Sequence, residues 1–235
     1  MALWRQIADR IRSEFISGAS EAQLPPETEL AARFGVNRHT VRAAIAALVG
    51  EGALRSEQGR GTFVVRRRRL AYPISRRTRF SAGLEGQARE RRSRLIDHCL
   101  ETASEEVAQA LNLAAGAGVI RIESVGEADG LPVSRATSWY DPARFANFPQ
   151  IYARTGSVTN ALAELGVTDY FRASTSVEAR HADPADIADL ALSPGAVVLV
   201  TRAVNIDPDG APIQYSITRF AADRVELRID YPRET

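Results

Sequence analysis

The chain has 235 residues, of which 45% are hydrophobic and 25% are charged. This length allows one large domain or two smaller ones, and the composition is that of a soluble globular protein with a substantial core. The single cysteine, Cys99, excludes an internal disulfide and agrees with a reducing compartment. No apolar run approaches the roughly 18 residues of a membrane span, and the N-terminus is too charged for a secretory signal, so we expect a cytoplasmic protein without membrane contact.

The net charge of +1 conceals an asymmetry along the chain. Residues 1–69 hold 12 arginines and 7 acidic residues, whereas residues 70–235 hold 18 arginines and 22 acidic residues. All 30 basic residues are arginine, which excludes Schiff-base lysine chemistry and the lysine of a phosphate-binding loop. A basic segment joined to a larger acidic one predicts a nucleic-acid-binding domain at 1–69 and a second domain at 70–235.

Helical spacing dominates the first domain. An amphipathic helix is predicted near the N-terminus, with a buried stripe made of Trp4, Ile7, Ala8, Ile11 and Phe15. Two prolines precede a second helix, which is expected to begin near Glu27. Gly35 then allows a turn, and Asn37 can cap a third helix through its side-chain oxygen. The buried stripe of this third helix is predicted to consist of Val41, Ala44, Ile45 and Leu48.

Two short strands are expected next, around a glycine-rich turn. Three helices followed by a hairpin form a winged helix-turn-helix, in which the N-terminus of the third helix enters the major groove of double-stranded DNA. The residues at that position are Asn37, Arg38, His39, Thr40 and Arg42. Arg60, at the tip of the wing, can reach a minor groove or the DNA backbone. In the simpler interpretation Asn37 only caps the helix and the arginines form a solvated face.

The segment LPPETELAARFGVNRHTVRAAIAALVGEGALRSEQGRGTFV resembles the DNA-binding domain of GntR-type bacterial transcription regulators. The resemblance covers residues 3–65. It implies that operator DNA is contacted by Arg38, Thr40, Arg42 and the wing residues Gln58, Gly59, Arg60 and Gly61. Pro26 stands where the family usually has a capping serine, and Thr28, a further candidate contact, stands where many members carry arginine.

Residues 66–73 are expected to form the linker and the start of the second domain, which contains an internal repeat with a spacing of roughly 80 residues. Leu111, Leu113, Gly116, Val119 and Ile120 recur as Leu190, Leu192, Gly195, Val198 and Leu199. The turn Asp129-Gly130 recurs as Asp209-Gly210. Each copy predicts a short helix, a strand, an Asp-Gly hairpin and a second strand. We therefore expect an α+β domain with one antiparallel sheet, helices packed on a face, and a pocket between two pseudo-symmetric halves.

The sequence favours binding over catalysis in that pocket. His39, His98 and His181 are dispersed, and no spacing indicates a metal site, a cofactor or a catalytic nucleophile. Hydroxyl groups at helix N-termini beside arginines suit a phosphate-like or carboxylate anion. The candidates on the residues alone are Arg76, Arg77, Thr78, Arg79, Ser81 and Ser157. The alternative is that Ser81 and Ser157 are plain helix caps and the arginines are surface residues.

The whole chain is similar to the HutC branch of the GntR family, whose UTRA-type effector domain has the chorismate-lyase fold without lyase activity, dimerises and binds small anions. The segments FGVNRHTVR, YPISRRTRFSAGL and QYSITRFAADRVEL resemble the phosphonate-utilisation regulators of that branch. This resemblance implies effector-binding roles for Arg79, Phe80, Ser81, Ser157, Tyr215, Ser216, Thr218 and Arg219. Two strand positions that often carry arginine in this branch are occupied by Ser124 and Gly126, and Gln214 replaces a common glutamate.

The resulting hypothesis is a dimeric repressor that binds an operator with inverted half-sites and senses a small anion such as a phosphonate or phosphate ester. A second hypothesis keeps this architecture but assigns a sugar phosphate or a histidine-pathway acid as the effector. A third, an enzyme with the lyase-like fold, is disfavoured because the sequence offers no catalytic constellation.

Overall fold

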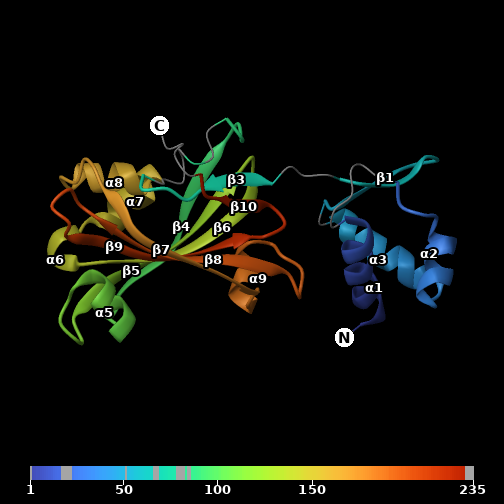
Figure 1. The fold of residues 1–235 in the computed structure, drawn as a ribbon, viewed down its shortest axis with the longest axis horizontal. Coiled ribbons are helices and arrows are strands. Elements are labelled where there is room, and N and C mark those ends of the chain that lie inside the picture. The colour runs from blue at the N-terminus through green and yellow to red at the C-terminus, as the bar shows by residue number, and fades with distance from the viewer. Residues whose placement is uncertain are drawn as a thin grey trace. The chain divides into compact units, whose positions relative to one another are not determined.

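A computed structural model of the protein describes residues 2–16, 23–50, 52–65, 69–77, 83 and 86–230. The chain divides into two compact units, Met1–Arg68 and Arg69–Thr235. The first unit is helical with a small hairpin, and the second is built around an antiparallel sheet (Figure 1). Among the described residues, no helix is both long enough and apolar enough to cross a membrane.

Three α-helices form the body of the N-terminal unit. They are α1 (Leu3–Ile11), α2 (Glu27–Phe34) and α3 (Arg38–Gly50). Their apolar stripes meet in one core, and the predicted stripe of α3 is confirmed because all four of its residues are buried. Between α2 and α3 the backbone turns at Gly35, which has the left-handed φ of 66° that glycine adopts without a steric penalty.

The first helix differs from its prediction at the C-terminal end. Its α-helical hydrogen bonding stops at Ile11, and a π-helical turn, η1, covers Arg12–Ile16. A π turn contains more residues than an α turn, so the α-helical spacing no longer holds beyond Ile11. Phe15, expected in the buried stripe, is accordingly only half-buried.

The predicted hairpin follows α3. Strands β1 (Leu54–Glu57) and β2 (Gly61–Val64) pair antiparallel, and their buried ends, Leu54 and Val64, join the helical core. The backbone N–H of Leu24 donates to the carbonyl oxygen of Thr62 at 2.8 Å, which ties the segment before α2 to the hairpin. The hairpin is therefore held by the helical core at its base and by the segment before α2 along β2.

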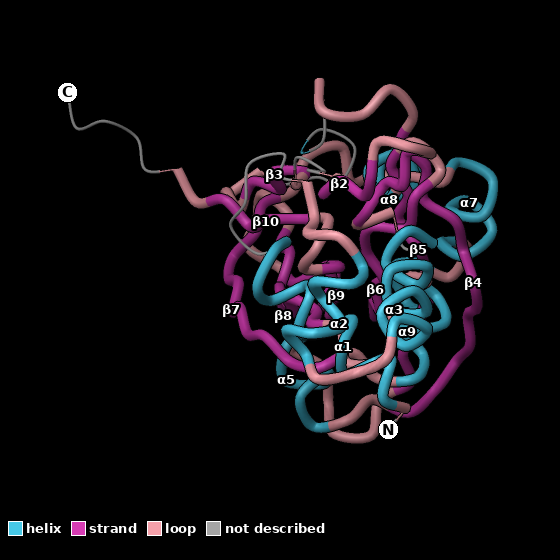
Figure 2. Tube along the Cα trace, turned by 90° about the vertical axis from the view of Figure 1, so that its right-hand side faces the viewer, coloured by secondary structure: helices cyan, strands magenta, loops and turns pink. Residues whose placement is uncertain are grey.

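The C-terminal unit contains a six-stranded sheet in the order β4-β5-β6-β9-β8-β7. The strands are β4 (Arg91–Thr102), β5 (Gly118–Ala128), β6 (Leu131–Tyr140), β7 (Phe171–His181), β8 (Val197–Ile206) and β9 (Pro212–Ala221). All neighbouring strands in it are antiparallel, and β4 and β7 form its two edges (Figure 2). A separate parallel pair joins β3 (Leu70–Pro73) to β10 (Val225–Arg228). The α+β prediction is confirmed.

The internal repeat corresponds to the two halves of this sheet. One half runs β4, α5, β5, β6 and the other runs β7, α9, β8, β9, so that β6 and β9 meet at the centre. The first hairpin has a two-residue turn in which Asp129 and Gly130 both have positive φ, the geometry that an Asp-Gly pair favours. The second hairpin is longer, with the Asp207 N–H donating to the Ala211 carbonyl oxygen across Gly210.

Helices cover both faces of the sheet, whereas the sequence predicted helices on one. They are α5 (Glu105–Leu111), α6 (Pro142–Phe145), α7 (Phe148–Thr155), α8 (Val158–Glu164) and α9 (Pro184–Asp189). Ile120 packs with α6, α7 and α8, while its neighbour Val119 packs with α5. Because successive strand residues point to opposite faces, the strands separate an α7/α8 face from an α5/α9 face (Figure 1).

Candidate functional sites

The first candidate site is the N-terminus of α3. The side-chain oxygen of Asn37 accepts hydrogen bonds from the backbone N–H of Thr40 at 2.8 Å and from its hydroxyl at 3.0 Å. Asn37 is therefore the predicted cap. The Thr40 hydroxyl is half-buried and engaged in this cap, whereas His39 is exposed and projects from the same turn.

Glu27, at the start of α2, holds the two arginines of this turn together. Its Oε2 lies 3.2 Å from Arg38 Nη2 and 3.1 Å from Arg42 Nη2, and its Oε1 accepts from Arg42 Nε at 3.3 Å. The hydrogen bond from Arg42, together with the one from Arg38, lowers the pKa of Glu27. Both arginine side chains remain more than half exposed, at 56% and 59%. They are thus oriented by one carboxylate and open to a ligand.

Sequence reasoning did not identify Glu27 in this role. It lies 11 and 15 residues before its two partners, and only the turn between the helices brings it beside them. Thr28, the neighbouring candidate, is exposed. Pro26 precedes α2 without any side-chain cap, in agreement with the loss of the usual serine.

The predicted wing residues lie at the exposed turn between β1 and β2. Gly61 has φ of 110°, and a Cβ there would collide with the side-chain amide of Gln23. That amide donates to the Arg60 carbonyl oxygen at 2.7 Å, which fixes the turn. Arg60 Nη1 lies 2.8 Å from Glu57 Oε2, and the rest of its side chain is in solvent. Gln58 and Gly59 are exposed beside it.

The second candidate site is a pocket of about 140 Å³ in the C-terminal unit. It lies on the α7/α8 face, over the central strands β6 and β9, where the sequence predicted a pocket between the two halves. Its described lining is rich in hydroxyl groups, contributed by Tyr72, Ser93, Ser124, Ser134, Ser138, Tyr152, Ser157, Thr159, Tyr170, Ser216 and Thr218. Ser124 and Gly126, which stand at positions where the proteins resembled often carry arginine, are part of this lining.

The predicted effector residues divide between two faces of the sheet. Ser216 and Thr218 line the pocket, whereas Tyr215 and Arg219 alternate with them and lie on the α5/α9 face. The Tyr215 ring stacks on Trp139 with centroids 5.6 Å apart, and its hydroxyl donates to Glu106. One site containing all four residues is therefore not formed.

Ser157 caps a helix, as one of the two sequence interpretations expected, and it also lies in the pocket wall. Its hydroxyl oxygen accepts from the backbone N–H of Asn160 at 3.2 Å, which caps α8, and the residue also lines the pocket. Arg76 and Arg77 stack over the ring of Phe171 at 4.8 and 4.7 Å. The remaining candidates, Thr78, Arg79, Phe80 and Ser81, lie outside the described residues.

Three lining residues that the sequence did not single out carry buried polar atoms without a hydrogen-bond partner in the described structure. These atoms are Arg91 Nη1, Arg172 Nε and Asn205 Oδ1. The signal available in the sequence was weak, because Arg172 meets Asn205 only through the pairing of β7 with β8. A bulge at the next residue shifts that register and makes the alternation of the strand hard to follow.

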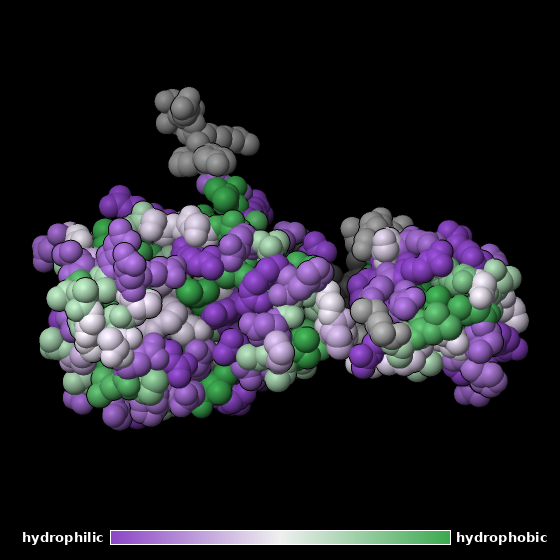
Figure 3. All heavy atoms as spheres, turned by 90° about the horizontal axis from the view of Figure 1, so that it is seen from below, coloured by the Kyte–Doolittle hydropathy of each residue, from purple (hydrophilic) through white to green (hydrophobic). Residues whose placement is uncertain are grey.

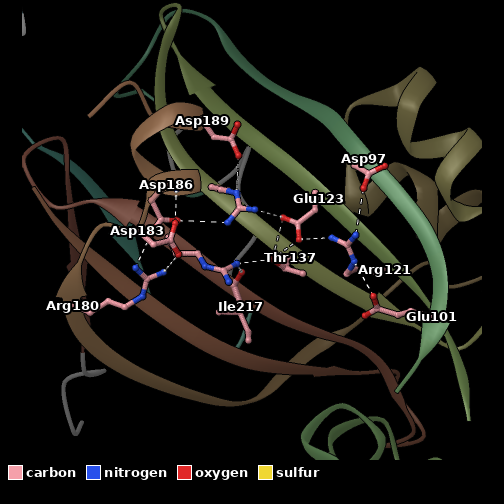
Figure 4. Close-up of polar contacts among 12 residues, drawn as sticks. Asp97, Glu101, Arg121, Glu123, Thr137, Arg180, Asp183, Asp186, Asp189 and Ile217 are labelled. Atoms are coloured by element: carbon pink, nitrogen blue, oxygen red, sulfur yellow. Dashed lines mark hydrogen bonds and ion pairs between the residues drawn. The ribbon is translucent and has the colours of Figure 1, made fainter. Parts of the chain in front are cut away.

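On the α5/α9 face, alternate residues of the same strands form a charged network (Figure 4). Glu123 Oε1 lies 2.8 Å from Arg121 Nη1, and Glu123 Oε2 lies 3.2 Å from Arg135 Nη2. Asp186 is fully buried. Its Oδ1 lies 3.6 Å from Arg135 Nη1, and its Oδ2 lies 2.7 Å from Arg180 Nη1. This side of the unit presents mostly hydrophilic residues, with small hydrophobic patches between them (Figure 3).

Arg219 belongs to this network and not to the pocket. Its Nη1 donates to Thr137 Oγ1 at 2.6 Å and to the Ile217 carbonyl oxygen at 3.0 Å. Burial lowers the pKa of Arg219, and the nearby charge of Arg135 lowers it further. The Thr137 hydroxyl also donates to Glu123. The network therefore lies on one face of the central strands, and the pocket lies on the opposite face of the same strands.

Comparison with protein-family models gives two matches that together span most of the chain. Residues 3–64 match the model described as bacterial regulatory proteins, gntR family. Residues 86–226 match the UTRA domain. The first match contains the α3 turn and the wing, and the second contains the sheet, the network and most of the pocket lining.

Individual proteins resemble the chain over nearly its full length. It is 53% identical over 232 residues to an uncharacterised HTH-type transcriptional regulator of Rhizobium meliloti, covering 98% of this chain and 95% of the relative. It is 31% identical over 210 residues to the probable transcriptional regulator PhnF of Escherichia coli, covering 88% and 86%. The crystal structure of PhnF from Mycobacterium smegmatis has the same fold, with a TM-score of 0.64 at 22% identity over 99% of this chain and 100% of that one.

Proposed function

The chain belongs to the GntR family of bacterial regulatory proteins and carries a UTRA domain, and on this premise we propose that it represses phosphonate uptake or utilisation genes under control of a small anionic effector. That it is a transcriptional regulator follows from the family. The choice of phosphonate genes is supported by the three segments that resemble phosphonate-utilisation regulators and by the 31% identity with PhnF of Escherichia coli.

The proposed DNA contacts are the first turn of α3 and the wing. Arg38 and Arg42 are exposed, lie on one side of the buried stripe, and are oriented by Glu27. A guanidinium can bond the O6 and N7 atoms of guanine in a bidentate way, and its fixed orientation favours discrimination between bases. The exposed Arg60 adds a phosphate or minor-groove contact from the wing. Asn37, His39, Thr40 and Thr28 complete the proposed surface.

The proposed effector site is the pocket on the α7/α8 face. The observation that carries this assignment is the pair of buried guanidinium N–H groups without partners, on Arg91 and Arg172, in a described lining that contains no carboxylate. Buried charge without compensation is unfavourable, so such groups favour binding of an anion. Ser157, Ser216 and Thr218 supply hydroxyl groups in the same pocket.

Control by the effector requires that it bind one arrangement of the DNA-binding units more tightly than another. We include a homodimer in the proposal, because a two-fold dimer presents two α3 turns to two inverted half-sites. An operator selected from random duplexes should therefore be palindromic, with half-site centres about one helical turn, or a multiple of it, apart. Light scattering of the full chain should give twice its 25.6 kDa mass.

The DNA contact is tested by Arg38→Ala on the selected operator. We expect specific affinity to fall by about 1–3 kcal/mol if Arg38 reads a guanine, with a smaller loss on scrambled DNA. Arg154→Ala is the matched control, because Arg154 is an exposed arginine of the other unit that also pairs with one carboxylate, Glu164. Unchanged discrimination between operator and scrambled duplex in Arg38→Ala would contradict the assignment.

The effector class is tested by thermal unfolding with orthophosphate, methylphosphonate, a hexose phosphate and urocanate. A ligand that binds the folded chain raises its unfolding temperature, and at one ligand concentration a tighter ligand raises it further. Stabilisation by the phosphorus anions that is lost in Arg91→Gln supports the pocket. Stabilisation by urocanate alone would favour the histidine-pathway alternative.

A further inference from the structure

Unpartnered buried polar atoms are concentrated in the pocket. Five such side-chain atoms occur in the described part of the chain, and three of them, in Arg91, Arg172 and Asn205, belong to pocket-lining residues. The other two belong to Asp186 and Arg219 in the charged network. Native structures satisfy most buried polar groups, so three such atoms around one cavity indicate a ligand with matching groups.

Asn205 is the most informative of the three because its side-chain amide belongs to a chain of buried hydrogen bonds. Its Nδ2 donates to Gln214 Oε1 at 2.6 Å. The Gln214 Nε2 donates in turn to Ser138 Oγ at 3.1 Å and to Tyr140 Oη at 2.7 Å. Asn205 is only 4% exposed, and its Oδ1 is left without a donor. The pocket therefore presents a buried hydrogen-bond acceptor at this point.

A cationic group stands directly beside this acceptor. Arg172 on β7 and Asn205 on β8 are paired residues of neighbouring strands, and both line the pocket. Paired residues of antiparallel strands have Cβ atoms roughly 5 Å apart. An anion at Arg172 and a hydrogen-bond donor at Asn205 would thus lie within the length of one small molecule.

The charge of the pocket restricts the kind of donor. Three arginines and no carboxylate line its described part. An ammonium group would enter this positive environment without a countercharge from the described lining, whereas a hydroxyl group would donate to Asn205 at no electrostatic cost.

Building on the proposed anion-binding function, we propose that the pocket selects anions that carry a hydroxyl group a few bonds from the charge. In this proposal Asn205 Oδ1 accepts a hydrogen bond from the hydroxyl group, and Arg172 binds the anion. Hydroxyalkyl phosphonates and hydroxyalkyl phosphate esters share this chemistry. Asn205 is then a specificity-determining residue, because a ligand without the donor leaves its oxygen unpaired.

The experiment measures binding of matched ligands to the full chain by calorimetry. The phosphonate series is ethylphosphonate, 2-hydroxyethylphosphonate, 2-aminoethylphosphonate and phosphonoacetate. The ester series is ethyl phosphate and 2-hydroxyethyl phosphate, and a difference between the two series identifies the source of the anion. The variants are Asn205→Leu and Arg172→Gln, with Asn147→Ala as the control because Asn147 is exposed and makes no side-chain cap.

In the wild type, we expect the hydroxyl compound of a series to bind roughly tenfold more tightly than its ethyl counterpart, and more tightly than the amino compound. Asn205→Leu should remove this preference while retaining the affinity for the ethyl compound. Arg172→Gln should weaken both compounds, and Asn147→Ala should change neither. If Asn205→Leu does not fold by circular dichroism, Asn205→Ala provides the same comparison.

Equal affinity for the ethyl and hydroxyl compounds in the wild type would overturn this inference and leave the proposed anion site intact. Preference for 2-aminoethylphosphonate would overturn the argument from charge. Preference for phosphonoacetate would show that Asn205 presents its N–H groups to the ligand, which also overturns the inference. Failure of every compound to bind would contradict the proposed anion site itself.

Discussion

At the proposed DNA-binding surface the arginines lie in solvent, whereas in the C-terminal unit comparable arginines are withdrawn into the protein. Arg38 and Arg42 are more than half exposed and share one carboxylate. Arg135 is only 15% exposed and lies among three carboxylates, while Arg91 presents a buried N–H group without a partner. Arginine side chains are thus largely exposed at the first site and largely withdrawn from solvent at the second.

This difference in exposure indicates whether an arginine affects folding stability or ligand binding. Exposed ion pairs contribute little to folding because water and salt screen them. A buried pair is costly to break because the remaining charge has no compensation. A buried N–H group without a partner does not stabilise the fold and is available to bind a ligand. Four changes, from the largest expected effect to the smallest, test this distinction.

Asp186→Ala should have the largest effect. It removes a fully buried carboxylate and leaves Arg135 and Arg180 with fewer partners, so the free energy of unfolding should fall by about 3–5 kcal/mol. Glu164→Ala breaks the exposed pair with Arg154 and should cost less than about 1 kcal/mol. Urea denaturation measures both, and similar losses in the two variants would contradict the distinction.

Arg91→Gln should affect binding and not folding. Loss of the unpartnered Arg91 Nη1 group should weaken the affinity for an anion by about 1.5–3 kcal/mol, the usual contribution of a hydrogen bond to a charged group. The stability of the unliganded chain should stay the same or rise. Arg94→Gln is the control on the same strand, because Arg94 is exposed and is not part of the described lining. Destabilisation of unliganded Arg91→Gln would show that this arginine has a structural role.

Arg60→Ala should weaken DNA binding without changing its sequence preference. Removal of one phosphate contact reduces the slope of log affinity against log salt by about 1. Binding titrations at several salt concentrations, on operator and scrambled duplexes, measure this slope. An effect confined to the operator would indicate that Arg60 reads bases instead.

Glu27→Gln should have the smallest effect on stability, less than about 1 kcal/mol at neutral pH. The arginines lower the pKa of Glu27, so its contribution is present above the ordinary glutamate pKa of about 4.3 and is lost as the pH falls through the lower, folded-state value. The difference in unfolding free energy between wild type and variant should therefore shrink between neutral and acidic pH.

The same variant tests whether Glu27 affects DNA binding by orienting the two arginines or only through its negative charge. Release of Arg38 and Arg42 should raise the affinity for scrambled DNA and reduce discrimination in favour of the operator. Glu29→Gln, an equal charge change on an exposed residue of the same helix, should raise both affinities without changing their ratio. Equal ratios in the two variants would mean that Glu27 acts only through its charge.

Local patterns determined the N-terminal unit and the repeat of the C-terminal unit. The stripe from Val41 to Leu48 leaves Arg38 and Arg42 beside it on the exposed part of the same helix, so the exposed surface follows from spacing along one segment. The Asp129-Gly130 turn likewise indicated a hairpin because few residue pairs adopt its backbone conformation. Such features depend on residues that are close in the sequence.

Only the tertiary structure decided which residues share a site. Strand alternation places Ser216 and Tyr215 on opposite faces of the sheet. The pairing of β7 with β8 brings Arg172 beside Asn205, although these two residues are far apart in the sequence. Glu27 reached the two arginines only through the turn between helices. The sequence by itself therefore determined the family, the helices and hairpin of the N-terminal unit and the repeat of the C-terminal unit. It did not indicate the π-helical turn after Ile11 or the helices on the second face of the sheet. The pocket depended on register between distant strands, because one residue of shift exchanges the two faces of a sheet.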